Sequence, residues 1–233
     1  MVNNWLNYLQ FSSIPPRCVL CGGAGEPALD LCNGCRGDLI CIANPCVQCG
    51  LPLQGEEPMR CGKCLKYPPY FDRVISSYLY QEPFSTLIQA LKFNARLQCS
   101  RVISQLMVDQ IAHAVEPLPE LLIPVPLHVA RTRERGFNQA LELARDLSRQ
   151  LKINLDFKSC QRLQQTKAQS GLDAAQRIAN LRNAFSLKNP LTARHVAIVD
   201  DVMTTGSTVN ALARVLKASG VECVEVWAAA RTV

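Results

Sequence analysis

The stretch from Val196 to Val209, VAIVDDVMTTGSTV, limits the fold of this chain more than any other. Its first four residues are apolar and mostly β-branched, which predicts a strand buried on both faces of a parallel sheet. Asp200 and Asp201 follow at the carboxyl end of that strand, where ligands bind in open α/β sheets. The apolar spacing of residues 210–218 predicts a helix that begins at about Ser207. The order of strand, acidic pair, turn and helix therefore predicts an α/β fold with a ligand site at one edge of its sheet.

The turn after the acidic pair is suited to binding a phosphate. Its residues are Thr204, Thr205, Gly206, Ser207 and Thr208. The start of a helix presents unpaired amides and a partial positive charge, and a glycine lets the backbone approach an anion closely. The two carboxylates before the turn can accept hydrogen bonds from neighbouring sugar hydroxyls, or hold a divalent cation through water. The pattern predicts a site for a ribose 5-phosphate; a capped strand-to-helix turn without a ligand is the alternative.

Four CxxC pairs near the amino end predict metal binding: Cys18/Cys21, Cys32/Cys35, Cys46/Cys49 and Cys61/Cys64. A gap of two residues lets both thiolates turn toward one ion, and two pairs complete the tetrahedron that zinc prefers. Gly22, Gly50 and Gly62 directly follow three of these cysteines, where a zinc knuckle needs a permissive backbone. We expect two structural zinc ions bound by successive pairs. An interleaved cross-brace is the alternative, and free or redox-active thiols are the others.

The cysteine-rich region cannot fold by burial of a core alone, because it is rich in proline and has few large aliphatic residues. Zinc would supply its folding energy. The segment Lys66–Phe71 contains two prolines and predicts a linker. We therefore expect a zinc-ribbon module at residues 1–66 and a larger domain at residues 71–233.

The cysteines also bear on the compartment. Nine of the twelve lie between Cys18 and Cys64, and such a density in a reducing compartment favours metal over disulfides. No run of 18 apolar residues occurs, so no membrane span is predicted. The first residues lack a basic leader and an uninterrupted apolar core, so no signal peptide is predicted. We expect a cytoplasmic protein.

A second strand–loop–helix unit has a basic loop. The predicted strand over residues 121–125 runs into Pro126, Leu127 and His128, and then into Arg131, Arg133 and Arg135. Together with a net charge of +6, this cluster suits a phosphate-bearing ligand. A solvated basic turn is the alternative, and His128 has the simpler interpretation of a polar cap.

The remaining segments fit the same α/β pattern. Apolar spacing predicts a strand over residues 73–80, helices over 82–93, 101–115 and 137–151, and a last strand over 221–230 that closes the sheet. Residues 164–185 are polar and are predicted to begin as a loop and become a helix near Asp173. An exposed linker is one interpretation of this segment.

Residues 196–209 resemble the phosphoribosyl-diphosphate (PRPP) signature of the type I phosphoribosyltransferases. The resemblance implies that Asp200 and Asp201 bind the ribose hydroxyls, and that residues 204–208 surround the 5-phosphate. It also implies that the basic loop, with magnesium, binds the pyrophosphate of PRPP. The segment 164–185 would then be a lid, and Thr166, Gln169 and Arg177 match its usual polar pattern.

The whole chain resembles the ComF/GntX family. The resemblance rests on the four CxxC pairs and on LIQALKF, PVPLHVARTRERGFNQA, TKAQSGL and VAIVDDVMTTGST, which occur in that order. It implies a zinc ribbon in front of a type I phosphoribosyltransferase domain, in a bacterial protein of natural competence, DNA uptake or the use of external DNA as nutrient.

Two classes of function remain open at this point. In the first, the domain binds PRPP or a nucleotide with magnesium, as a phosphoribosyltransferase whose acceptor is unknown. In the second, it is a non-catalytic module that binds the phosphates of single-stranded DNA, or a partner protein of the uptake machinery.

Overall fold

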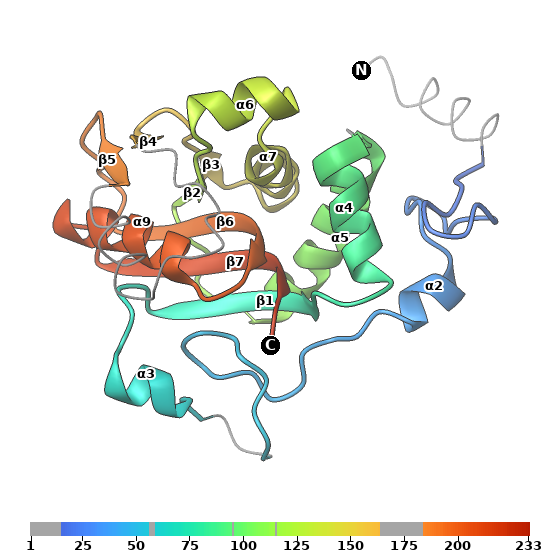
Figure 1. Cartoon of the computed structure of the whole chain (residues 1–233), viewed down its shortest axis with the longest axis horizontal. Coiled ribbons are helices and arrows are strands. Elements are labelled where there is room, and N and C mark those ends of the chain that lie inside the picture. Colours follow the sequence, from blue (N-terminus) through green and yellow to red (C-terminus); the bar gives the residue numbers. More distant parts are fainter. Residues whose placement is uncertain (1–14, 56–58, 95, 115, 164–183) are drawn as a thin grey trace.

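The computed structural model describes residues 15–55, 59–94, 96–114, 116–163 and 184–233. Its centre is a parallel sheet with the strand order β1-β7-β6-β2-β3 (Figure 1). The strands are β1 Arg73–Leu79, β2 Leu121–Pro124, β3 Asn154–Leu155, β6 His195–Met203 and β7 Cys223–Arg231. Because these strands run in the same direction, their carboxyl ends share one edge of the sheet.

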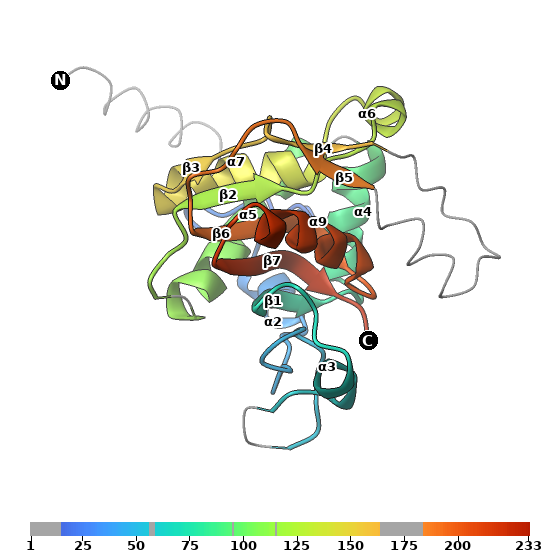
Figure 2. The same ribbon diagram turned by 90° about the vertical axis from the view of Figure 1, so that its left-hand side faces the viewer.

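Helices cover both faces of the sheet. They are α4 Phe84–Asn94, α5 Leu97–Ala114, α7 Gln139–Leu151 and α9 Ser207–Ala218. Apolar residues of α4, α5 and α7 form one buried cluster, which includes Ala197 and Val199 of β6. Val196 and Ile198 pack instead with α9 (Figure 2), so β6 is buried on both sides and its apolar run is continuous. Among the helices that the structure describes, none combines the length and the apolar character needed to cross a membrane.

β6 is longer than the sequence predicts. We expected a strand over residues 196–199 that ends before the aspartates, but pairing with β7 extends it through Asp200 and Asp201 to Met203. β2 pairs with β6 only as far as Val199, which lies opposite Pro124. The acidic pair therefore lies in an extension of β6 beyond its ladder with β2.

Two other expectations are wrong. Residues 129–135, expected within a basic loop, form the helix α6 Val129–Arg135, because His128 caps its start and Gly136 ends it in a left-handed conformation. β7 does not close the sheet but lies inside it, between β1 and β6.

An antiparallel pair of short strands, absent from the sequence-based prediction, lies outside the main sheet. It joins β4 Cys160–Arg162 to β5 Phe185–Leu187. β5 contacts α9, and both strands contribute to the buried cluster on the α9 face. The predicted lid segment connects these two strands.

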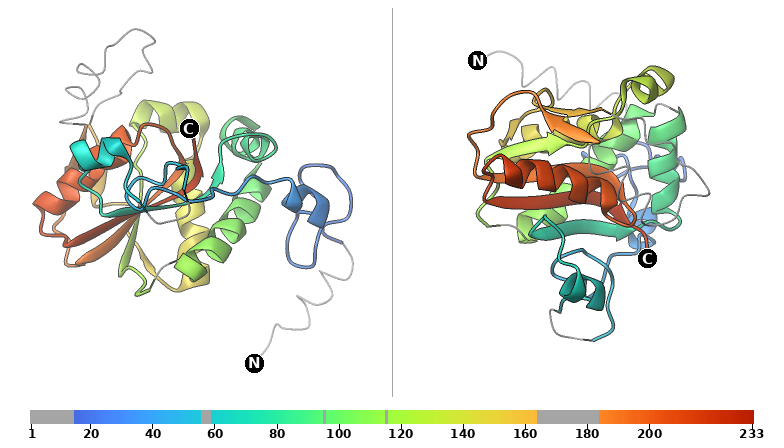
Figure 3. Two further views of the ribbon diagram at one scale, coloured as in Figure 1. Left: turned by 90° about the horizontal axis from the view of Figure 1, so that it is seen from below. Right: turned by 60° about the vertical axis from the view of Figure 1, so that its left-hand side comes forward.

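The cysteine-rich region packs on the sheet domain in two separate places (Figure 3). The first ribbon, residues 18–35, leads into α2 Asn33–Gly37, where Arg36 pairs with Asp109 of α5 at 3.0 Å. The second ribbon, residues 46–64, leads into α3 Gly62–Lys66, and its four cysteines belong to the buried cluster on the α9 face. The first ribbon therefore rests beside α5, and the second rests along the edge strand β1.

Candidate functional site

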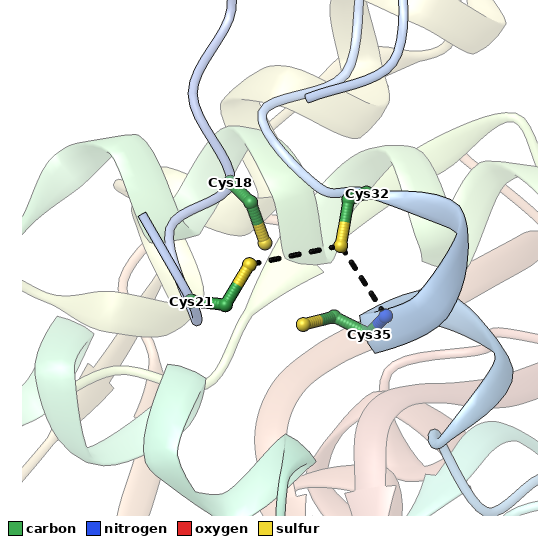
Figure 4. Close-up of side chains that lie close together, drawn as sticks. All are labelled: Cys18, Cys21, Cys32 and Cys35. Atoms are coloured by element: carbon green, nitrogen blue, oxygen red, sulfur yellow. Dashed lines mark hydrogen bonds between the residues drawn. The ribbon is translucent and has the colours of Figure 1, made fainter. Parts of the chain in front are cut away.

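Eight cysteines form two clusters of four, each made of two successive CxxC pairs. They are Cys18, Cys21, Cys32 and Cys35 in the first ribbon, and Cys46, Cys49, Cys61 and Cys64 in the second, and the sulfurs of each cluster lie within 4.8 Å of one another. Figure 4 shows the sulfurs of the first cluster turned toward a common centre. The cysteine pairs therefore combine sequentially, and the interleaved cross-brace is excluded.

The distances within the clusters fit zinc. Sγ of Cys21 lies 3.7 Å from Sγ of Cys32, and Sγ of Cys49 lies 3.7 Å from Sγ of Cys61. Four Zn–S bonds of about 2.3 Å in a tetrahedron give sulfur–sulfur edges of about 3.8 Å. Each cluster therefore has the dimensions of a structural zinc site.

Backbone amides favour the thiolate form of Cys18 and Cys46, whereas burial raises the pKa of Cys49 and Cys64, and hydrogen bonds with neighbouring sulfurs raise the pKa of Cys35. The amide of Cys35 donates to Sγ of Cys32 at 3.4 Å, and the amide of Cys61 donates to Sγ of Cys46 at 3.2 Å. Burial opposes the ionisation of Cys18, but its hydrogen bonds from backbone amides outweigh burial and lower the pKa of this thiol to about 6. Zinc binds the deprotonated sulfur, so these amides assist metal binding.

The knuckle glycines follow the prediction only in part. Gly22 and Gly50 have left-handed φ angles of 74° and 68°, which glycine adopts without strain. Gly62 is instead the first residue of α3, so the expectation of a knuckle is wrong there. The second ribbon closes its site with the start of a helix.

A third group of potential metal ligands has a structural explanation. His195, Cys223 and Glu225 lie at or near the amino ends of β6 and β7, far along both strands from the acidic pair. The buried Glu225 carboxylate already accepts hydrogen bonds from Arg73 at 2.6 Å and from Trp227 at 2.9 Å, and Nε2 of His195 lies 2.9 Å from it. We interpret the group as a buried link between β1, β6 and β7, because the guanidinium compensates the carboxylate.

The acidic pair of β6 contacts a cationic group from another element. The amide of Asp201 donates to Oδ1 of Asp200 at 2.9 Å, and Oδ2 of Asp201 lies 3.1 Å from Nζ of Lys92. Lys92 belongs to the last turn of α4. The ion pair is largely buried, with 18% of the lysine side chain and 12% of the aspartate side chain exposed.

The ionisation of Asp200 is perturbed. Burial, and then the neighbouring charge of Asp201, raise the pKa of Asp200 from 3.8 to about 7, against the opposing effect of Lys92 and Arg162. A carboxyl group held at this pKa gains strongly from a further cation. Carboxylate oxygens are also the donors that Mg²⁺ prefers, so the pair is chemically suited to a magnesium-bound ligand.

The turn between β6 and α9 has the open surface that a phosphate needs. Thr204 and Thr205 are exposed, and the hydroxyls of Thr205 and Ser207 lie 2.9 Å apart. The N-cap of α9 is Gly206, which has no side chain to cap the first amides. The predicted aspartate or serine cap is therefore wrong, and the amide of Ser207 donates instead to Oγ1 of Thr205 at 3.4 Å.

Gly206 is required by the packing beneath the turn. Its φ angle is 76°, and a Cβ atom at this position would lie 2.6 Å from Cε of Met203 and 3.9 Å from Cζ of Phe71. Both neighbours are almost completely buried. The turn therefore packs on the buried side chains of Met203 and of Phe71 from the linker, which together form the floor of the turn.

The basic segment is only partly directed toward the acidic pair. Pro126 and Leu127 lead from β2 into α6, and Nδ1 of His128 accepts a hydrogen bond from the amide of Ala130 at 3.2 Å, as the polar-cap interpretation predicts. Arg131 of α6 interacts electrostatically with Arg162, and its charge lowers the pKa of that guanidinium. Arg162 in turn interacts with Asp200, so Arg131 is the arginine of α6 nearest in charge coupling to the acidic pair.

The other two arginines of α6 have different surroundings. Arg133 is exposed. Arg135 donates to Oε1 of Gln139 at 3.1 Å and lies over the ring of Phe93, with 5.7 Å between its Cζ atom and the ring centroid. The predicted basic cluster is thus divided between the candidate site and the surface near α4.

Lys92 and Arg162 are site residues that the sequence did not single out. Lys92 lies within the LIQALKF motif, but its spacing along a helix does not indicate a contact with β6. Arg162 belongs to β4. Burial is the main cause that lowers the pKa of its guanidinium, and the charge of Arg131 lowers it further. The charge of Asp200 acts in the opposite direction. Arg162 therefore interacts electrostatically both with Arg131 of α6 and with Asp200 of the acidic pair.

The predicted lid residues Thr166, Gln169 and Arg177 lie outside the described residues. The strands at either end of their segment are described, and Arg162 at the end of β4 interacts electrostatically with Asp200. β4, the last described strand before this segment, therefore ends beside the candidate site.

Two hollows lie elsewhere on the described structure. One has a volume of about 240 Å³ and lies between the first ribbon, α5 and α7, and the other has about 320 Å³ and adjoins the amino end of β2. Neither is lined by the acidic pair or the turn after it.

Known proteins match both parts of the chain. The family model for the double zinc ribbon domain matches residues 12–65, and the model for the phosphoribosyl transferase domain matches residues 138–231. Competence protein F of Haemophilus influenzae is 39% identical over 234 residues, which cover 97% of this chain and 99% of the relative. The chain belongs to the competence protein F family.

Two other known proteins are also similar to the chain. The DNA utilization protein YhgH of Escherichia coli K12 is 38% identical over 206 residues, covering 87% of this chain and 90% of the relative. Competence protein ComFC of Bacillus subtilis is 26% identical over 202 residues, covering 84% and 81%. These matches confirm the resemblance and the fold class, a parallel-sheet α/β domain with a double zinc ribbon, and the two clusters of four cysteines support two structural zinc ions.

Substitution of Gly206 by alanine should destabilise the protein by about 2 kcal/mol, measured as the free energy of unfolding in urea. About half of this cost comes from the left-handed backbone and the rest from overpacking against Met203. Gly220→Ala is the matched control, because its φ angle is 98° and a Cβ atom there meets nothing within 4 Å. Equal costs for the two variants would show that the floor under the turn is not tight.

Substitution of Asp200 by asparagine should stabilise the protein in a pH-dependent way. The pKa of Asp200 is raised to about 7, so the folded state binds this proton more tightly than the unfolded state, and wild-type stability falls as the pH rises toward 7. Asparagine removes this loss, so the stability advantage of the variant should grow by about 2 kcal/mol between pH 5.5 and 8. The exposed Glu222→Gln serves as control. A constant difference across this range would contradict the raised pKa.

Proposed function

We propose that the carboxyl end of β6 binds PRPP together with Mg²⁺. In this proposal, the amides and hydroxyls of residues 204–208 hold the 5-phosphate, and Asp200 and Asp201 hold the ribose hydroxyls and the hydrated cation. The observation that supports this most is the juxtaposition of a carboxyl group with a raised pKa and the amino end of α9, beside the exposed Thr204 and Thr205. The match of residues 138–231 to the phosphoribosyl transferase domain gives the same chemistry independent support.

The pyrophosphate of PRPP would be held by cations. Arg162 interacts electrostatically with Asp200 and with Arg131, and Lys92 pairs with Asp201. Displacement at the anomeric carbon of ribose passes through a cationic transition state and releases a strongly anionic diphosphate, which such groups and Mg²⁺ stabilise. We propose that Thr166, Gln169 and Arg177 complete the site as a lid that excludes water.

The biological role that we propose is in competence or DNA utilization, as the names of the relatives indicate for those proteins. The chain would act in the cytoplasm, where reduced thiolates remain available to zinc. Binding of PRPP or of a nucleotide would then serve the uptake of DNA or the use of external DNA as a nutrient. Proteins of the uptake machinery are proposed partners.

Titration calorimetry with PRPP and Mg²⁺ tests the proposal. The wild-type protein should bind, and the double variant Asp200→Ala, Asp201→Ala should lose at least about tenfold in affinity, because each carboxylate supplies charge-assisted hydrogen bonds. Glu222→Ala, an exposed carboxylate near the opposite end of the sheet, should bind as the wild type does.

Two results would count against PRPP binding. One is an undetectable heat of binding in the zinc-loaded wild-type protein, and the other is equal affinity in the double variant. A variant that has lost PRPP binding but still supports growth on DNA would separate PRPP binding from the biological role.

A second candidate function is binding of single-stranded DNA near α6. Phe93 has 71% of its surface exposed, and Arg135 lies over its ring. Bases of single-stranded nucleic acid stack on exposed aromatic side chains, and arginines neutralise the phosphates. We propose Phe93 with Arg131, Arg133 and Arg135 as the surface for this function.

The dependence of DNA affinity on salt tests this second function. Replacing the three arginines of α6 by alanine should weaken binding of a single-stranded oligonucleotide, and should flatten the slope of log K against log salt by about two units. The control is Arg145→Ala with Lys158→Ala, which removes two cations around the exposed Phe157. An equal loss per cation removed in both variants would mean that general charge, rather than the α6 surface, binds the DNA.

A further inference from the structure

Arg231 is a buried cation at the end of β7. Only 6% of Arg231 is exposed, and its guanidinium donates hydrogen bonds to backbone carbonyls. Nη1 donates to the carbonyls of Met203 at 3.1 Å and of Thr232 at 2.8 Å, and also to the carbonyl of Thr204. Met203 and Thr204 are the residues at which β6 passes into the turn of residues 204–208, which we call the phosphate turn after its proposed ligand. One face of this side chain therefore holds the start of that turn.

The other edge of the same guanidinium reaches the second ribbon. Nε of Arg231 donates to the carbonyl of Cys49 at 3.2 Å. Cys49 is a ligand of the second cluster, and Gly50 after it packs so closely on β1 that a Cβ atom would lie 3.1 Å from Cγ1 of Val74. One side chain thus joins a metal ligand to the turn.

Burying a guanidinium costs free energy, and the hydrogen bonds to four carbonyls offset that cost only while all of them stay in place. The planar fork fixes the relative positions of its acceptors, which a lysine ammonium does not do. If the second ribbon moves, Arg231 loses its bond to Cys49, and its bonds to the carbonyls at the start of the turn are expected to shift as well.

A second contact runs parallel to this one. Nε2 of Gln48, the neighbour of Cys49, donates to the carbonyl of Phe71 at 3.4 Å, and Phe71 forms part of the floor beneath Gly206. The first ribbon is attached differently, through Arg36 to Asp109 on α5. Among the described residues, these contacts join the second zinc site, rather than the first, to the turn.

We propose that Arg231 is a positioning residue that couples the second zinc site to the phosphate turn, so that metal in the second ribbon sets the conformation of residues 203–206. The consequence for ligand affinity rests on the proposed PRPP function, but the coupling itself does not. The first zinc site stabilises its own ribbon and leaves the turn unchanged.

Hydrogen exchange of single amides tests the coupling without any ligand. The amide of Asn210 bonds to the carbonyl of Gly206 and reports on the turn, whereas the amides of Gly50 and Gly22 report on the second and first ribbons. Exchange is measured by NMR in the full-length, zinc-loaded protein. In Arg231→Lys, exchange should become about tenfold faster at Asn210 and Gly50 and stay unchanged at Gly22.

Removal of each zinc site completes the experiment. Cys61→Ser should accelerate exchange at Asn210, and Cys21→Ser, the matched control in the first ribbon, should not. In a double-mutant cycle, Cys61→Ser should add little at Asn210 once Arg231 is lysine, which a merely structural role of Arg231 would not produce. If Cys61→Ser fails to fold, Cys61→His takes its place, since it retains a zinc ligand with a different bond length.

The outcomes separate the two proposals. Additive effects of Cys61→Ser and Arg231→Lys at Asn210, or an equal response to Cys21→Ser, would overturn the coupling. Coupled exchange in a protein that does not bind PRPP would overturn the proposed function and leave the coupling in place. Where PRPP binds, Arg231→Lys should weaken it by about tenfold, within the range of typical coupling between sites.

Discussion

The parallel pairing of β6 between β7 and β2 is the constraint on which the rest of the candidate site depends. The ladder with β7 continues to Met203, whereas the ladder with β2 ends at Val199, so the acidic pair extends beyond the packed part of the sheet. The turn and the amino end of α9 then follow at the same edge. Shortening or shifting this strand by one residue would move the aspartates and the turn together.

The site is assembled from segments that are far apart in the sequence. Lys92 arrives from α4, Arg162 from β4 and Phe71 from the linker behind the second ribbon. The two cations keep two adjacent carboxylates in a partly buried position, which would otherwise be unfavourable. The zinc ribbon is therefore part of the architecture of the site, because its linker and its cysteine carbonyl both contact the region around the phosphate turn.

Local patterns in the sequence predicted the elements that local physics determines. The buried strand at residues 196–199, the helix starting at Ser207 and the two sequential cysteine clusters were all predicted correctly. Lys92, Arg162 and Arg231 were not found, because a contact between distant segments leaves no periodicity in the chain. The helix α6 was missed because its charges suggested a loop, although the helix boundaries at His128 and Gly136 were present in the sequence.

A crystal structure of the zinc-loaded protein grown with PRPP and Mg²⁺ would test the central idea most directly. We predict density for the 5-phosphate within hydrogen-bonding distance of the amides of residues 205–208, with the ribose hydroxyls and the cation beside Asp200 and Asp201. Density for PRPP at another place, or a turn that stays empty beside intact aspartates at saturating ligand, would contradict it.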